Sequence, residues 1–217
     1  AGLQIVEVEA DRWAFDSGAK KWHKSGVHFR RLIALVETDG EGVALVDLAR
    51  ISGGITHWRM CRGLEGDFSA GDVPLVGRKG TVADPMGQRG CIDSLEHPDH
   101  AALAYMDDVS TCPAPGSWKG LWQSRFEENV HLDIHQLQAS SETELLTARA
   151  TAMMGEPEES TYDFSTVLWR RKPDGDTTLL DLVFEPRIAE STLSEVIAVS
   201  SKDRCSSGVR LLTCKGR

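Results

Sequence analysis

This sequence of 217 residues lacks several features that would place it in a class of protein at once. No apolar run approaches the length that crosses a membrane, so we expect no membrane span. P-loop, dinucleotide-binding, nucleophile-elbow and zinc-protease motifs are all missing, so the chain carries no self-sufficient catalytic motif. The first residues, 1–4, match neither a signal peptide nor a natural start, and we therefore expect a fragment of a larger protein.

Paired cysteines and net positive charge are missing too. The five cysteines are odd in number and have no short paired spacing, which argues against a disulfide framework or a zinc knuckle but leaves one or two bridges open. A net charge of −9 disfavours nucleic acid and anionic membranes as partners, because both are attracted to positive surfaces. Residues 20–62 are the exception, with eight Lys and Arg against four acids. These arginines either serve a ligand or are solvated on strand edges.

No stretch with a helical period exceeds about three turns, so we predict an all-β protein. We expect one antiparallel β-sandwich domain over residues 1–217, with long irregular loops and little helix. Strands are predicted at 3–10, 27–37, 42–51, 126–138, 144–152, 161–171, 177–185, 193–199 and 209–212. Strand 144–152 is predicted to pair with 126–138, and a turn with Asp-Gly at its centre joins 27–37 to 42–51. Residues 63–120 are expected to be loops, apart from a strand at 101–106.

The most informative stretch is 44–63, which indicates two strands separated by a turn. Gly53 and Gly54 are adjacent, so the backbone can take positive φ there and approach another segment closely. In the strand that follows, His57, Arg59 and Cys61 point one way, and Trp58, Met60 and Arg62 point the other.

This stretch resembles the C-terminal β region of heparinase II/III-like polysaccharide lyases. The matching positions are Val46, Asp47, Gly53, Gly54, His57, Trp58 and Gly63. Residues 27–36 are similar to the family's aromatic-Arg-Arg strand, which pairs with its Val-Asp strand. Residues 167–171 and 180–186 are similar to its late hairpin, which ends in Phe-Glu-Pro.

The resemblance implies β-elimination on an anionic, uronic-acid-containing polysaccharide such as a glycosaminoglycan or alginate. It implies that the main catalytic residues lie in an N-terminal α/α toroid of the same protein, which this chain lacks, so that the isolated chain is inactive or nearly so. It also implies a periplasmic or secreted location, which the residues themselves do not indicate. The alternative is a non-catalytic carbohydrate-binding or structural β-domain.

Carried over by position, His57 is the predicted catalytic residue, which polarises the substrate carboxylate or orients the sugar. The alternative is a histidine that stabilises the glycine turn by a hydrogen bond. Trp58, Arg59, Arg62 and Arg31 are the predicted substrate-binding residues, because guanidinium groups suit planar carboxylates and sulfates. Trp58 and Arg62 stand where the family commonly has aspartate and histidine, which argues against zinc at this turn.

Two other segments contain metal-ligand side chains. His131, Asp133 and His135 alternate along a predicted strand, so they either bind zinc or calcium or simply face water. Residues 96–100 read Glu-His-Pro-Asp-His and favour a polar turn. No cofactor is assigned, although zinc and calcium stay open.

Three aromatic residues, Trp13, Phe15 and Trp22, fall in a polar segment that we predict to be a loop. They either stack on sugar rings or cap an edge of the sandwich.

Overall fold

A computed structural model describes residues 2–16, 18–38, 40, 42–63, 66–93, 95, 98–113, 115–137, 142–153, 161–173, 177–201 and 207–215. Nearly all regular structure in these ranges is β-strand. The elements are β1 (Leu3–Asp16), β2 (Lys21–Glu37), β3 (Val43–Ser52), β4 (His57–Arg62), β5 (Gly66–Ser69), β6 (Val76–Arg78), the 3-10 helix η1 (Pro98–Tyr105), β7 (Met106–Pro113), β8 (Trp118–Ser124), β9 (Val130–Gln136), β10 (Thr143–Met153), β11 (Thr161–Arg171), β12 (Thr177–Ile188), β13 (Leu193–Ser200) and β14 (Ser207–Thr213). No helix in the described ranges is long and apolar enough to cross a membrane.

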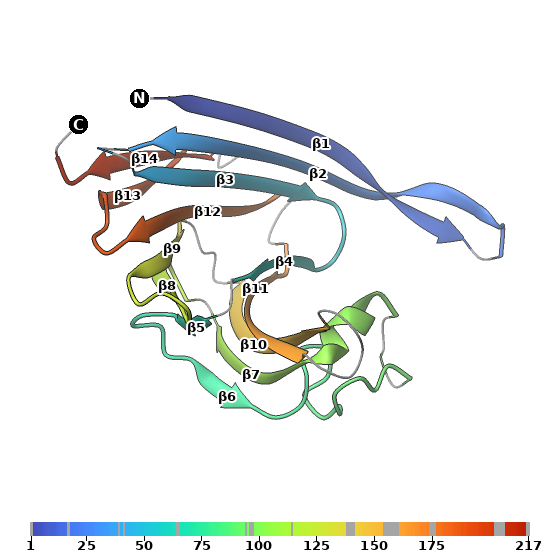
Figure 1. The fold of residues 1–217 in the computed structure, drawn as a ribbon. Coiled ribbons are helices and arrows are strands. Elements are labelled where there is room, and N and C mark those ends of the chain that lie inside the picture. Colours follow the sequence, from blue (N-terminus) through green and yellow to red (C-terminus); the bar gives the residue numbers. More distant parts are fainter. Residues whose placement is uncertain are drawn as a thin grey trace.

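The strands form two antiparallel sheets and a C-terminal hairpin. The first sheet has the order β1-β2-β3-β12-β9-β8-β5, and the second has the order β4-β11-β10-β7-β6. β13 and β14 pair with each other alone. The two sheets face one another as a sandwich (Figure 1), so the predicted all-β class is confirmed.

Three apolar layers hold these parts together. Between the sheets, Ile134 and Leu182 pack with Leu145, Val167 and Trp169. In a second cluster, apolar residues of β7, β10 and β11 pack against Val82, which follows β6, and Leu103 of η1. A third joins β2, β3 and β12 to the C-terminal hairpin. Each layer buries apolar area on both of its sides, which is the main driving force for the fold.

A polar contact fixes the tryptophans of the central layer. The rings of Trp118 and Trp169 stack with centroids 6.1 Å apart and an interplanar angle of 14°. Both indole N–H groups donate to the side-chain oxygen of Gln136, which is itself buried. The N–H groups of these two buried indoles are thereby satisfied.

Local structure differs from prediction in three places. Residues 63–120 were expected to be mostly loops, but β5, β6, β7 and the start of β8 form strands there, because each pairs with a neighbouring strand. Residues 101–105 belong to η1, and the strand begins only at Met106. This segment reads Ala-Ala-Leu-Ala-Tyr and contains no β-branched residue, so its composition suits a helical turn better than a strand. Trp13 and Trp22 lie in β1 and β2, in a segment that we predicted to be a loop.

Strand pairing differs as well. β2 pairs with β3 as predicted, although Asp39 and Glu41 of their turn lie outside the described residues. β10 pairs with β11 and β7, so the prediction that it pairs with β9 is wrong. β11 and β12 were expected to form a hairpin, but they lie in different sheets: β11 pairs with β4 and β10, and β12 pairs with β3 and β9.

Candidate functional site

The turn between β3 and β4 carries the chain from the first sheet to the second. Gly53 has a φ of 73° and Gly54 a φ of 79°, both in the region that favours glycine. A Cβ on Gly53 would lie 2.0 Å from the carbonyl oxygen of Gly26 in β2. The prediction of positive φ and close backbone approach at this doublet is therefore confirmed.

His57 closes this turn. Its Nε2 lies 2.6 Å from the carbonyl oxygen of Gly53, and only 4% of the residue is exposed. A carbonyl can only accept, so Nε2 carries the proton and, in the neutral ring, Nδ1 carries the lone pair. Nδ1 is buried and has no partner among the described residues. The imidazole thus does what the turn-stabilising alternative predicted, and one acceptor is left unused.

A hollow of about 550 Å³ opens beside this turn. Three segments line it: the base of the β1–β2 hairpin, residues 54–58, and η1. The lining residues are Arg12, Val27, Gly54, Ile55, Thr56, His57, Trp58, His100, Ala102 and Leu103. The volume is typical of a small-molecule site. Its polar lining comprises one guanidinium, two imidazoles and a hydroxyl, and no carboxylate of the described residues lines it, so the hollow suits an anionic or neutral polar ligand.

Trp58 forms one wall of the hollow. The guanidinium carbon of Arg170 lies 5.5 Å from the centre of the indole, and the ring of His100 meets it edge-on, 6.0 Å away at 70°. Arg170 in turn pairs with Glu144. These contacts hold the indole in a fixed position, as an aromatic surface that orients a ligand requires.

Two of the predicted arginines converge elsewhere, on Asp47. Arg31 binds Asp47 through Nε at 2.8 Å and a terminal nitrogen at 2.6 Å, and Arg59 binds the same carboxylate. Arg59 also donates to the carbonyl of Leu180. The Asp47 side chain is 1% exposed, against 10% for Arg59 and 41% for Arg31.

These contacts perturb the two guanidinium groups in opposite directions. Burial lowers the pKa of Arg59, and Asp47 offsets this in part. The hydrogen bonds to Asp47 raise the pKa of Arg31. The cluster fastens β3 of the first sheet to β4 of the second.

The five predicted site residues therefore do not gather around one ligand. His57 and Trp58 line the hollow, Arg31 and Arg59 are bound to Asp47, and Arg62 is exposed at the far end of β4. The catalytic role of His57 stays a prediction.

Arg12 was missed by the sequence reading, because only the register of β1 against β2 brings it to the hollow. That register shifts between Asp11 and Trp13, opposite Gly26 with its φ of 77°. A bulge of this kind turns a side chain toward a new direction. The glycine on the partner strand, Gly26, was the signal in the sequence that could have located this bulge.

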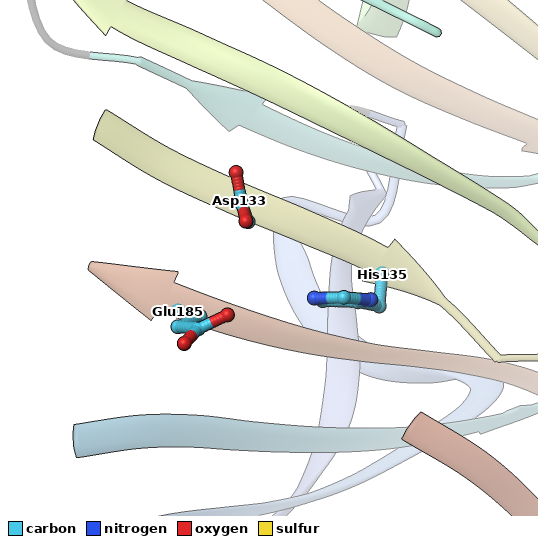
Figure 2. Close-up of side chains that lie close together, drawn as sticks. All are labelled: Asp133, His135 and Glu185. Atoms are coloured by element: carbon cyan, nitrogen blue, oxygen red, sulfur yellow. The ribbon is translucent and has the colours of Figure 1, made fainter. Parts of the chain in front are cut away.

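Among the described residues, one group has the ligand types of a metal site: Asp133, His135 and Glu185, whose nearest ligand atoms all lie within 4.8 Å of one another. Asp133 and His135 come from β9, and Glu185 comes from the neighbouring strand β12 (Figure 2). Glu185 is directly opposite Asp133 in the register, and it takes the place we had predicted for His131. The place of Glu185 beside Asp133 follows only from the pairing of β9 with β12.

Both carboxylates already have partners. Asp133 binds Lys119 at 2.7 Å and Arg187 at 3.1 Å. Burial raises the pKa of Asp133, but the hydrogen bonds from these two cations outweigh it and lower the pKa overall.

Glu185 accepts four hydrogen bonds from Ser191, Thr192 and Leu193, at 2.6–3.1 Å. A divalent cation in this cluster would meet the charges of Lys119 and Arg187 at close range. The arrangement therefore suits an internal ion-pair network better than a metal site. Glu96 and His97 of the other candidate lie outside the described residues.

Comparison of the chain with models of known protein families gave no match, and a search of curated proteins gave none. The resemblance to polysaccharide lyases therefore stands on the matching residues alone.

Proposed function

We propose that this chain is the β-sandwich portion of a polysaccharide lyase that acts on uronic-acid-containing polysaccharide, and that its hollow holds one sugar unit of the polymer. The observation that carries the proposal is the lining of the hollow: a guanidinium from Arg12, imidazoles from His57 and His100, and the indole of Trp58. An indole suits the apolar face of a sugar ring, and a guanidinium suits its carboxylate.

β-Elimination needs three groups, and we assign one of them to this chain. A base removes the proton next to the carboxylate, an acid protonates the leaving oxygen, and a cationic group neutralises the carboxylate while charge develops on it. Arg12 is placed to supply the third of these. The Nε2 proton of His57 is engaged by Gly53, so His57 positions the turn that carries Trp58. The base and the acid come from the toroid that the resemblance implies.

The first test is binding by the chain itself. We expect alginate or heparan sulfate to retard the chain in affinity electrophoresis and an uncharged mannan to have no effect. Arg12→Gln should weaken binding about tenfold or more, because a hydrogen bond to a charged group contributes roughly 1.5–3 kcal/mol. Arg62→Gln is the matched control, since it removes an exposed arginine outside the hollow. Equal binding by wild type and Arg12→Gln would refute the assignment of the hollow.

A second test separates the lyase from the non-catalytic alternative. The chain is fused behind an α/α toroid of the lyase family, and the ultraviolet absorbance of the unsaturated product is followed. Product that forms in the fusion and falls with Arg12→Gln supports the lyase. Binding without product, in a fusion whose toroid is folded, supports the carbohydrate-binding domain.

A further inference from the structure

The end of the β1–β2 hairpin carries an unusual surface. The hairpin continues past the register shift between Asp11 and Trp13, and its turn end extends beyond both sheets of the sandwich (Figure 1). Trp13 is 53% exposed and Trp22 is 64% exposed, whereas Trp118, Trp122 and Trp169 are buried. The indoles of the hairpin therefore contribute little to the core.

The register places these indoles on one face. Trp13 lies opposite Lys24, and Phe15 lies opposite Trp22. Directly opposed residues of an antiparallel pair share a face, and so do residues two apart on one strand. Trp13, Trp22 and Lys24 are thus neighbours on the same side of the hairpin, which we call the indole face.

The charge of this segment is opposite to that of the whole chain. Residues 11–24 contain four Lys and Arg against two Asp, while the chain carries a net charge of −9. One pair, Lys24 with Asp11, is joined at 2.5 Å, and both side chains remain at least one-third exposed. A basic segment with flat aromatic side chains complements an anionic polymer that also has apolar ring faces.

We propose that the indole face is a second contact for the same acidic polysaccharide, so that the hairpin extends the binding surface away from the hollow. This inference rests on the proposed function. The two surfaces adjoin along β1, because Arg12 lines the hollow and Trp13 is the next residue in the chain. Sugar rings beyond the unit in the hollow stack on Trp13 and Trp22, while Lys24 and its neighbours face their carboxylates or sulfates.

The test is how affinity depends on ligand length. Binding of a uronate-containing disaccharide and of a long oligosaccharide of the same polymer is measured by calorimetry. Wild type should bind the long ligand more tightly than the disaccharide. The double variant Trp13→Ala/Trp22→Ala should lose about tenfold in affinity for the long ligand and keep wild-type affinity for the disaccharide, because only the long ligand reaches the indole face.

Phe126→Ala is the matched control, because this aromatic residue is 77% exposed at a different place and should leave both affinities unchanged. Unchanged binding of the long ligand by the double variant would overturn the inference. Loss by the double variant together with wild-type binding by Arg12→Gln would leave the indole face standing and remove the hollow. Tighter binding of single-stranded DNA or anionic vesicles than of the polysaccharide, at equal salt, would overturn the choice of ligand.

Discussion

Replacing Asp47 with asparagine removes one negative charge and leaves two guanidinium groups facing each other between the sheets. Arg31 is 41% exposed, so water compensates much of its loss. Arg59 is 10% exposed and is not compensated in this way. Breaking a buried ion pair by removing one partner costs roughly 3–5 kcal/mol. We expect Asp47→Asn to lower the free energy of unfolding by an amount in this range, which is a large part of the total stability of a typical domain.

Urea unfolding followed by tryptophan fluorescence measures this effect, because Trp118 and Trp169 are buried in the central layer. The midpoint should fall while the slope stays near that of wild type. Glu7→Gln is the control. It breaks the Glu7–Arg30 pair, whose two side chains are each more than 40% exposed, and should leave the midpoint near wild type.

A rescue variant separates lost charge balance from lost packing. Arg59→Met in the Asp47→Asn background removes the uncompensated buried cation while keeping an unbranched side chain of similar reach. It should recover part of the lost stability. Exposed ion pairs contribute less than about 1 kcal/mol, so a loss of unfolding free energy below this value for Asp47→Asn would refute the reasoning. It would also be refuted if the double variant were less stable than Asp47→Asn alone.

The glycine turn and a second buried carboxylate give further predictions. Gly53 and Gly40 both have positive φ, so replacing either with alanine should cost roughly 1–2 kcal/mol. Gly53→Ala should cost clearly more than Gly40→Ala, because only at Gly53 would the new Cβ collide with backbone, the carbonyl of Gly26. Equal midpoints of the two variants in urea would contradict this. Burial raises the pKa of Asp181, whose oxygens lack hydrogen-bond partners of ordinary geometry within the described residues. Its folded-state pKa lies above the unfolded value, so wild type loses stability as pH rises through the folded pKa. Asp181→Asn should therefore be more stable at pH 7, by about 1 kcal/mol or more. In a pH series of urea titrations, this difference should shrink as pH falls through the raised folded-state pKa toward the ordinary aspartate pKa, because Asp181 of the wild type then takes up a proton. A constant or inverted difference would contradict the assignment.

The sequence correctly predicted features that depend only on a few consecutive residues. The glycine doublet showed where the chain turns, and the alternation after it showed that His57 and Arg59 share one face and Trp58 the other. The Asp-Gly sequence correctly joined β2 to β3. Each of these features is set by sterics or by the two-residue period of a strand, and both can be read from a few consecutive residues.

Long-range pairing was beyond such reading. β9 and β10 are consecutive strands, and consecutive strands often pair, yet they lie in different sheets. The strand pattern does not distinguish a hairpin from a crossing of the sandwich, since both leave one face of each strand apolar. The partners of Asp133 show the consequence, because Glu185 and Arg187 come from β12, about fifty residues further along the chain.

For the same reason, only part of the lining of the hollow could be predicted from the sequence. Its wall, His57 and Trp58, follows directly after the glycine turn and was found from sequence, whereas Arg12 and His100 reach it only through the β1–β2 bulge and the packing of η1. The Asp47 cluster holds β3 against β4, and Gly53 lies against Gly26 at the base of the hairpin, so the turn is fixed on both sides. A change at Asp47 should therefore disturb the hollow without touching its lining. If Asp47→Asn, at a temperature where it remains folded, binds the polysaccharide as wild type does, the turn keeps its position without the cluster, and the ion pairs of Arg31 and Arg59 with Asp47 serve stability alone.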